Sequence, residues 1–276
     1  MQPKIGFVGL GTMGKPIAMN IANAGFDLTV FDLRDDPCRE LAALGAKVAA
    51  SPRQIAENSD IVEIVVVDDD QTEEVVGGRD GLLDAARSGS VVAVHSTVLP
   101  QTVTRLAERC AARGVAMIDA PVSGGQQGAR DKNLCYMVGG DSAALERCRP
   151  VFATSAKTIF HLGALGMGAT AKMLIQIVVC LNMVAAQECE LICDKTGLRF
   201  EMLQQVLHVS AGQSFVLDHW LGRFKKAEDC EPVRRHREEV FAQSLLPALE
   251  LARDLGVELP GAAIARDLMK GIFGSR

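Results

Sequence analysis

The stretch that decides the fold is Lys4-Ile-Gly-Phe-Val-Gly-Leu-Gly-Thr-Met-Gly14, in which a short apolar segment leads directly into a glycine-rich turn. Residues 5–8 are typical of a buried strand, and a helical pattern follows the last glycine. In such a strand–turn–helix unit the first glycine permits the tight turn. The second lets a pyrophosphate approach backbone N–H groups, and the third lets the helix pack on the strand. The segment therefore predicts a dinucleotide-binding turn, whose candidate residues are Gly9, Leu10, Gly11, Thr12, Met13 and Gly14.

A carboxylate stands where this kind of fold would use one. Asp32 follows the apolar run Leu28–Phe31, about 20 residues beyond the glycines, and there it can bind the hydroxyls of the adenosine ribose. The same carboxylate repels a 2′-phosphate. We therefore expect NAD as the cofactor, with NADP left open because Arg34, two residues later, could bend toward a phosphate.

Strand and helix signals alternate over residues 1–163. Continuous apolar strands between helices predict a parallel sheet that is covered on both faces. Ser51-Pro52-Arg53-Gln54 begins one helix with an N-cap, a proline and a capping-box glutamine, and Pro100–Arg113 forms another that stops at Gly114. The expected strands are Ile5–Val8, Leu28–Phe31, Val48–Ala49, Ile61–Val67, Val91–Val94, Ala116–Asp119, Cys135–Val138 and Ile159–His161.

The pattern changes after Gly168. Nothing breaks a helix between Ala169 and Lys195, which predicts a single helix of roughly 40 Å. The remaining residues are helical in pattern and carry no strand signal. We therefore expect an α/β domain over residues 1–163 and an all-α domain over residues 164–276, joined by the long helix.

Composition excludes several classes of protein. The chain has 276 residues and a net charge of −5, with 1 Trp and 1 Tyr. A nucleic-acid partner is not expected, because such proteins are usually basic and use aromatic side chains to stack on bases. The most apolar stretch, Met173–Ala186, is interrupted by Gln176 and Asn182 and is too short for a bilayer, so no membrane span is expected either.

A secretion signal is not expected either. The first residues of the chain lead straight into a strand, without a charged leader, an apolar run and a cleavage site. The 8 cysteines are scattered and include no Cys-x-x-Cys pair, so we expect reduced thiols and no structural metal. Both observations favour a cytoplasmic location.

Two further segments carry candidate chemistry. In Asp119-Ala-Pro-Val-Ser-Gly-Gly125, the Ser123 hydroxyl and the backbone N–H groups of Gly124 and Gly125 suit a carboxylate, although an ordinary glycine-rich turn has the same composition. Lys172 opens an apolar helix, where an unpartnered ammonium is costly unless it reaches water or performs a task. Gln176 lies one turn later, so the pair could hold and protonate an oxygen. The alternative is a lysine that snorkels to water beside a packed glutamine.

Taken together, the motifs resemble those of the β-hydroxyacid dehydrogenase family, which includes 3-hydroxyisobutyrate dehydrogenase, tartronate semialdehyde reductase and threonate dehydrogenase. The resemblance covers nearly the whole chain. Its four matching segments, in order, are Gly9–Gly14, Ser96-Thr97, Asp119–Gly125 and Gly163-x-x-Gly-x-Gly-x-x-x-Lys172.

The resemblance implies a Rossmann-like first domain and a homodimer or homotetramer in which the long helix packs on the partner. It implies that Ser123, Gly124 and Gly125 hold a substrate carboxylate, beside Gln176. Lys172 would be the general base in oxidation and the general acid in reduction, a role that a lowered pKa would suit. Thr97 would lie near the nicotinamide ribose. Cofactor-binding candidates outside the glycine turn are Asp32, Val67, Asp68, Thr97 and Gln243.

Two positions depart from the family pattern. Gln176 replaces an asparagine, which slightly favours a polyhydroxylated, threonate-like acid over 3-hydroxyisobutyrate. Gln243 replaces a lysine on the cofactor side of the site, a loss for which the basic stretch Arg234–Arg237 could compensate, although an exposed helix face is the simpler explanation of that stretch. The alternatives are therefore an NADPH-dependent semialdehyde or aldehyde-acid reductase, or a dinucleotide-binding protein with degraded catalysis.

Overall fold

The structure is a computed structural model that describes residues 2–225 and 231–273. The chain forms two compact units, Met1–Lys172 and Met173–Arg276. Helix α8 (Met167–Thr196) begins in the first unit and continues in the second. It is slightly longer than the helix expected at 169–195, and the domain limits 1–163 and 164–276 stay a prediction.

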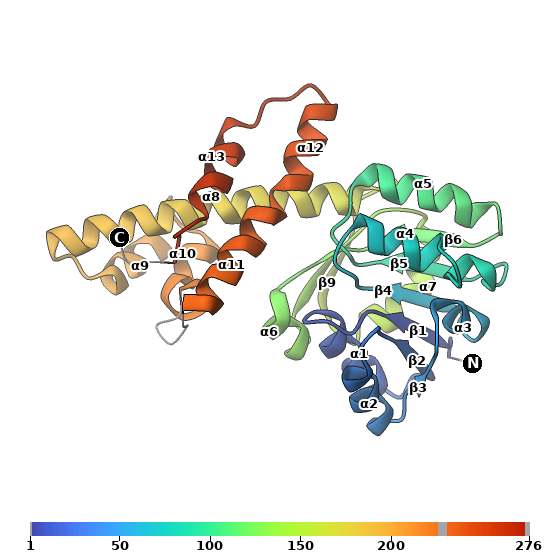
Figure 1. The fold of residues 1–276 in the computed structure, drawn as a ribbon. Coiled ribbons are helices and arrows are strands. Elements are labelled where there is room, and N and C mark those ends of the chain that lie inside the picture. The colour runs from blue at the N-terminus through green and yellow to red at the C-terminus, as the bar shows by residue number, and fades with distance from the viewer. Residues whose placement is uncertain (1, 226–230, 274–276) are drawn as a thin grey trace. The chain divides into compact units, whose positions relative to one another are not determined.

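A six-stranded sheet organises the first unit, with the strand order β3-β2-β1-β4-β5-β6 (Figure 1). Every neighbouring pair is parallel, as predicted. The chain moves outward from β1 and then returns to its other side, so the order reverses between β1 and β4. Ligands of such sheets bind at this reversal, beyond the carboxyl ends of the strands. The strands are β1 (Ile5–Val8), β2 (Leu28–Phe31), β3 (Lys47–Val48), β4 (Ile61–Ile64), β5 (Val91–Val94) and β6 (Ala116–Asp119).

Helices cover both faces of this sheet. Ile17 and Leu41 pack on one face with Phe7, while Val103 and Leu106 pack on the other. The strands are therefore buried on both sides, which explains their continuous apolar sequences. The helices of this unit before α8 are α1 (Gly14–Asn23), α2 (Asp35–Ala43), α3 (Pro52–Glu57), α4 (Asp69–Gly77), η1 (Leu82–Asp84), α5 (Pro100–Ala111), α6 (Gly125–Arg130) and α7 (Ser142–Phe152).

The capping box of α3 is formed as the sequence predicts, with one difference. The Ser51 hydroxyl accepts a hydrogen bond from the Gln54 backbone N–H at 3.3 Å. The Gln54 side chain reaches back to the N–H of Ala50, at 2.6 Å, rather than to that of Ser51. Helix α5 ends at Ala111, two residues before the expected Arg113.

The sequence pattern placed the last strands in the same parallel sheet as the others, and this prediction is wrong. Strands β7 (Val122–Ser123), β8 (Leu134–Val138) and β9 (Ala156–His161) form a separate sheet, in which β7 and β8 are antiparallel and β8 and β9 parallel. Strand β7 was not predicted, because it has two residues and lies beside two glycines. Strand β4 ends at Ile64 rather than Val67, because its neighbour β1 ends at Val8.

Within the described residues of the second unit every regular element is helical. Its core contains Cys180, Met183, Trp220, Met269 and Phe273. After α8 the helices are α9 (Phe200–His208), α10 (Phe215–Asp218), the π-helical turn η2 (Trp220–Phe224), α11 (Glu231–Ser244), α12 (Leu246–Asp254) and α13 (Pro260–Leu268).

Helix α8 is long and apolar enough to cross a membrane by length and composition alone. The sequence pattern predicted that the apolar stretch Met173–Ala186 is too short for a bilayer. That prediction is wrong, because the helix extends well beyond both of these residues. Core helices of soluble domains meet the same criterion, and Cys180, Met183 and Ala186 of α8 pack in the core of the second unit.

Candidate functional site

The glycine-rich turn after β1 has the geometry of a dinucleotide site. Gly9 has φ of 93°, and a Cβ there would lie 2.1 Å from the carbonyl oxygen of Val65. A Cβ on Gly14 would lie 1.9 Å from the carbonyl oxygen of Gly9, whereas one on Gly11 would meet nothing within 4 Å. The first and third glycines are thus required by packing, while the second leaves its backbone open to an approaching group.

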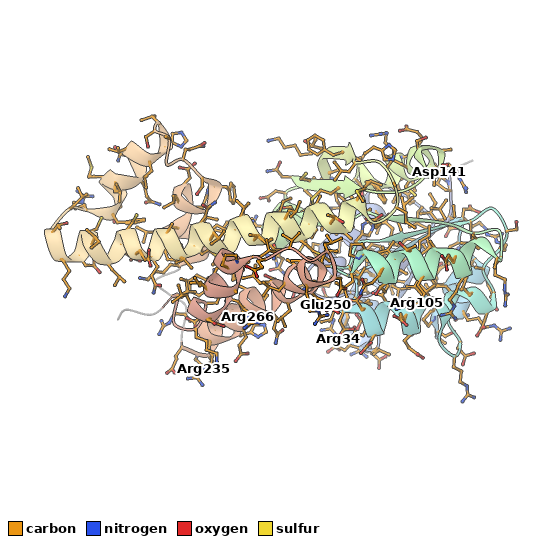
Figure 2. The ribbon with its side chains drawn as sticks, turned by 90° about the horizontal axis from the view of Figure 1, so that it is seen from above. Arg34, Arg105, Asp141, Arg235, Glu250 and Arg266 are labelled. Carbon is orange, nitrogen blue, oxygen red and sulfur yellow. The ribbon has the colours of Figure 1, made fainter. Side chains whose placement is uncertain are left out.

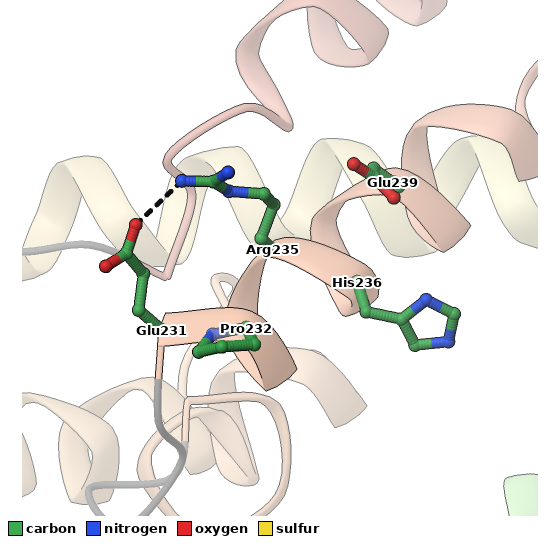
Figure 3. Close-up of a pocket in the computed structure, with 5 residues that line it drawn as sticks. All are labelled: Glu231, Pro232, Arg235, His236 and Glu239. Carbon is green, nitrogen blue, oxygen red and sulfur yellow. Dashed lines mark hydrogen bonds and ion pairs between the residues drawn. The ribbon is translucent and has the colours of Figure 1, made fainter.

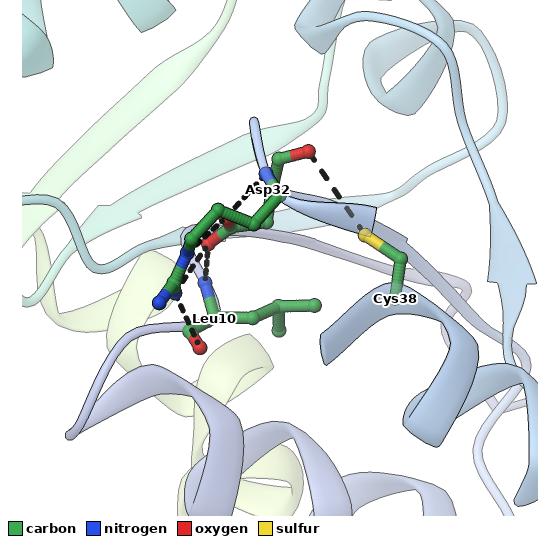
Figure 4. Close-up of polar contacts among 4 residues, drawn as sticks. Leu10, Asp32 and Cys38 are labelled. Atoms are coloured by element: carbon green, nitrogen blue, oxygen red, sulfur yellow. Dashed lines mark hydrogen bonds and ion pairs between the residues drawn. The ribbon is translucent and has the colours of Figure 1, made fainter. Parts of the chain in front are cut away.

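The carboxylate of Asp32 is fixed against this turn (Figure 4). Its Oδ2 accepts from the N–H of Leu10 at 2.6 Å, and its Oδ1 accepts from the backbone N–H and the Nε of Arg34, at 2.9 and 3.0 Å. Arg34 also donates to the Leu10 carbonyl at 3.2 Å. Burial acts to raise the pKa of Asp32, but the hydrogen bonds from Arg34 and Leu10 together lower it below its usual value. Asp32 therefore stands as an anion at the position where the ribose is expected.

The candidates after β4 and β5 lie at the same edge of the sheet. The Ser96 hydroxyl accepts from the N–H of Val66 at 2.8 Å and so joins the two strand ends. Val67 is exposed, and Thr97 is partly exposed. Asp68 uses its carboxylate to cap α4, accepting from the Gln71 N–H at 2.9 Å. The strand ends thus bring Val67, Asp68 and Thr97 to the edge that carries the glycine turn.

The segment after β6 forms a turn that requires glycine. Gly124 and Gly125 have φ of 137° and 64°, and a Cβ on Gly124 would lie 2.8 Å from the Leu134 side chain. Ser123, which is partly exposed, ends β7 just before them. The predicted anion-binding group of hydroxyl and backbone N–H groups is therefore assembled in one turn.

Lys172 lies against this turn and does not snorkel. Its Nζ donates to the carbonyl oxygen of Val122 at 2.9 Å, one residue before Ser123. Burial lowers the pKa of Lys172 to about 8, and the neighbouring Cys135 acts weakly in the opposite direction. An amine with a pKa of about 8, whose bond within the described part of the chain goes to a neutral carbonyl, can either give or take a proton.

Three buried polar side chains, Asp119, His95 and Glu63, support the segments next to this turn, and the sequence pattern did not indicate these roles. The Asp119 carboxylate accepts from the N–H groups of Gly166 and Ala169, at 2.8 and 2.7 Å. His95 contacts the Ala120 carbonyl through Nδ1 at 2.7 Å and the fully buried Glu63 through Nε2 at 3.1 Å. The sequence held one signal of the Glu63–His95 contact, namely a charged residue, Glu63, inside the apolar strand β4.

The remaining candidates belong to the second unit. Gln176 lies one turn beyond Lys172 on α8. Gln243 lines a cavity of about 390 Å³ that also contains the cations Arg266 and Lys270, and Arg266 is paired with Asp267 at 3.2 Å. The binding roles of Gln176 and Gln243 stay predictions.

The basic stretch on α11 makes contacts within its own unit. Arg235 pairs with Glu231 at 2.7 Å, and both residues line a cavity of about 310 Å³ with Pro232, His236 and Glu239 (Figure 3). Arg237 donates to the Arg223 carbonyl at 2.9 Å and stacks over the Phe273 ring. These contacts favour an exposed helix face over a replacement for the family lysine.

Comparison with known proteins agrees with the geometry. The family model for the NAD binding domain of 6-phosphogluconate dehydrogenase matches residues 4–163. The model described as the NAD-binding region of NADP-dependent 3-hydroxyisobutyrate dehydrogenase matches residues 166–273. Together the two models cover almost the whole chain.

Similar proteins extend over the same length. The chain is 36% identical to 2-hydroxy-3-oxopropionate reductase of Escherichia coli strain K12, over 96% of this chain and 89% of that protein. It is 32% identical to 2-(hydroxymethyl)glutarate dehydrogenase of Eubacterium barkeri, over 97% and 88%, and 34% identical to NAD-dependent L-serine dehydrogenase of Pseudomonas aeruginosa, over 92% and 83%.

A solved structure shares the fold. The 3-hydroxyisobutyrate dehydrogenase of Mycobacterium tuberculosis, studied with L-serine, superposes with a TM-score of 0.85 at 26% identity, over 98% of this chain and 93% of that one. Its fold, the two family models and the sequence relatives all agree with the resemblance in the four motifs. The chain belongs to the β-hydroxyacid dehydrogenase family and is an NAD(P)-dependent oxidoreductase of that family.

Proposed function

We propose that the protein transfers a hydride between a nicotinamide cofactor and a small 3-hydroxy acid, with Lys172 as the general acid and base. The observation that carries this proposal is the bond of 2.9 Å between the Lys172 ammonium and the carbonyl of Val122. It puts a group whose pKa is about 8 directly beside the turn that suits a carboxylate.

The names of the relatives narrow the substrate class. Serine, 3-hydroxyisobutyrate, 2-(hydroxymethyl)glutarate and 2-hydroxy-3-oxopropionate all carry a carboxylate and a CH₂OH or CHO group on the same carbon, C2. They differ in the group on C2. A substrate of the form RCH(OH)–CHX–COO⁻ therefore fits, with R a hydrogen atom in these hydroxy acids. The extra reach of Gln176 favours a polyhydroxylated acid such as threonate, in which R is CH₂OH and X is OH.

In the proposed reaction each protein group has one task. The Ser123 hydroxyl and the N–H groups of Gly124 and Gly125 bind the carboxylate, and Gln176 binds a second substrate oxygen. Neutral Lys172 accepts the proton of the C3 hydroxyl while the C3 hydride leaves. In the reverse direction its ammonium donates that proton to the carbonyl oxygen. The bound nicotinamide supplies the hydride acceptor or donor.

For the cofactor we propose NAD, held by the turn at residues 9–14 and by Asp32, Val67, Asp68, Thr97 and Gln243. The anionic state of Asp32 supports NAD, because it would repel a 2′-phosphate. Arg34, already beside that carboxylate, keeps NADP as the alternative, and with it an NADPH-dependent aldehyde-acid reductase. We also propose that the dinucleotide-binding domain spans residues 1–163 and the all-α domain residues 164–276.

We also propose a homodimer or homotetramer in the cytoplasm. Leu174, Val178 and Leu181 of α8 are exposed at intervals of four and three residues, which aligns them on one helix face. A second copy of the chain would cover this face. The free cysteines among the described residues agree with a reducing compartment.

A protein that binds the dinucleotide without turnover is the second candidate, and Gln243 favours it because it replaces the family lysine. Against it, Lys270 supplies positive charge in the cavity that Gln243 lines, beside the ion pair of Arg266 and Asp267.

The test is the absorbance of reduced nicotinamide, with NAD and then NADP, over a panel of 3-hydroxyisobutyrate, 3-hydroxypropionate, glycerate, serine and threonate. We expect turnover with at least one of these acids, reduced by about 10²–10⁴-fold in Lys172→Ala. Lys157→Ala, at an exposed lysine on β9, is the matched control and keeps wild-type turnover. Dinucleotide binding without turnover on any acid would favour the binding protein, and full activity in Lys172→Ala would refute the mechanism.

A further inference from the structure

Asp119, the last residue of β6, holds the start of the helix that carries Lys172. One carboxylate oxygen, Oδ1, accepts from the Gly166 N–H at 2.8 Å, and the other, Oδ2, accepts from the Ala169 N–H at 2.7 Å. The residue is 1% exposed. Both oxygens are thus used on backbone donors that an α-helix leaves unpaired at its first turn.

The backbone lies so close to this carboxylate that Gly139 and Gly168 leave no space for side chains of their own. A Cβ on Gly139 would lie 2.5 Å from Oδ1, and one on Gly168 would lie 2.8 Å from Oδ2. The Asp119 backbone is also paired with Gly139 in both directions, at 3.1 and 2.8 Å. The Asp119 carboxylate is therefore held close to the backbone at Gly139 and Gly168.

The same residue leads into the turn on which Lys172 rests. Asp119 precedes Val122 by three residues, and Ala169 precedes Lys172 by three. The hydrogen bond from Ala169 to Asp119 and the bond from Lys172 to Val122 close a small ring of chain between β6 and α8. If the first bond is weakened, the lysine and the turn are free to separate.

We propose that Asp119 is a positioning residue for Lys172, fixing the first turn of α8 so that the ammonium stands against the Val122 carbonyl and beside Ser123. The expected effect on kcat rests on the proposed function, whereas the expected effect on the start of α8 and on Lys172 does not. Asp141 (labelled in Figure 2) also caps a helix but is exposed. Its carboxylate accepts a hydrogen bond from the Ala144 N–H of α7 at 2.9 Å.

The test compares Asp119→Asn with Asp141→Asn. An amide keeps one acceptor and turns an NH₂ group toward a backbone donor, so the start of α8 should loosen and admit water to Lys172. Competitive labelling of amines, followed by mass spectrometry, measures the pKa of Lys172 without any substrate. We expect Asp119→Asn to move that pKa from about 8 back toward 10.5. We also expect kcat to fall roughly 10²-fold, as a displacement of about 1 Å can cause, with the dinucleotide Kd nearly unchanged.

Asp141→Asn should lower the melting temperature slightly and change neither the pKa nor kcat. Asp119 is only a structural cap if Asp119→Asn lowers the melting temperature while the pKa of Lys172 and kcat stay at wild-type values. If the pKa shifts but the wild type oxidises no hydroxy acid, the positioning role stands and the proposed function fails. Should Asp119→Asn not fold, Asp119→Ser gives the same readouts, because serine caps α3 and α10 in this chain.

Discussion

At the scale of single residues, the acceptor that Lys172 uses is as important as its burial. A carboxylate partner would hold the amine in its charged form, whereas the Val122 carbonyl binds it without a counter-charge. Burial therefore decides the direction of the shift, and it lowers the pKa to about 8. The residue is then close to half protonated at mildly alkaline pH and can serve both directions of the reaction.

The first prediction concerns pH. Oxidation needs neutral Lys172, so kcat for oxidation should rise as the pH increases through about 8 and then level off. Reduction needs the ammonium, so its kcat should fall over the same range. Initial rates in both directions between pH 6 and 10 check this, with Lys172→Ala lacking either limb. A rate that does not change across that range would separate Lys172 from the proton transfer.

The second prediction concerns the cofactor. Arg34 occupies Oδ1 of Asp32, the oxygen that a ribose hydroxyl would need. Arg34→Ala should therefore tighten NAD and weaken NADP, each by several-fold. Asp32→Ala combined with Leu33→Arg should shift the preference to NADP, and Leu33 tolerates the change because it is 93% exposed. Kd values for NADH and NADPH, from the fluorescence of the reduced nicotinamide, decide the matter, and an unchanged ratio of the two in both variants would mean that Asp32 does not face the ribose.

At the scale of elements, the sequence pattern predicted the features that depend on residues close together in the chain. The strands of the six-stranded sheet, the capping box at Ser51 and the glycine turn all follow from neighbouring residues. The bond from Lys172 to Val122 joins residues 50 positions apart, and no local pattern contains it. The sequence contains Asp119 within a recognised motif, but its contacts with α8 could not be predicted for the same reason, since the partners lie 47 and 50 positions away.

The third prediction separates the two kinds of glycine in the turn. Gly14→Ala puts a Cβ 1.9 Å from a backbone oxygen and should destabilise the fold strongly, with a clear drop in melting temperature. Gly11→Ala meets nothing within 4 Å, so the melting temperature should hardly change. Its added methyl would instead stand where the pyrophosphate approaches, and dinucleotide affinity should fall by about 10-fold or more. Equal melting temperatures for the two variants would contradict this division of roles.

At the scale of the whole molecule, two compact units share one helix. Helix α8 supplies Lys172 to the first unit and Cys180, Met183 and Ala186 to the core of the second. It also leaves Leu174 and Val178 in solvent. Sequence pattern predicted the length of α8 well, but it could not tell which of its apolar faces the rest of the chain covers.

The fourth prediction tests what covers that face. Val178 is 57% exposed, and Val178→Glu should dissociate an assembly that packs on α8, while leaving each unit folded. Val209→Glu, at a position that is 83% exposed beyond the end of α9, is the control and should leave the mass unchanged. Light scattering during gel filtration measures both. A wild type that runs as a monomer, or an assembly that Val178→Glu does not disturb, would rule out this interface.

The contact between Glu63 and His95 has a consequence for how this sequence can change. The Ala120 carbonyl can only accept, so Nδ1 of His95 donates to it, while Nε2 contacts the Glu63 carboxyl group. Each of these two buried side chains is thus the polar partner of the other, and either single replacement leaves a polar group among apolar side chains. Glu63→Leu or His95→Met alone should cost several kcal/mol, about 3–5, in the free energy of unfolding, and the double variant should recover most of the loss. Evolution can thus cross between a polar and an apolar version of this core only in a paired step, so the two positions should be inherited together.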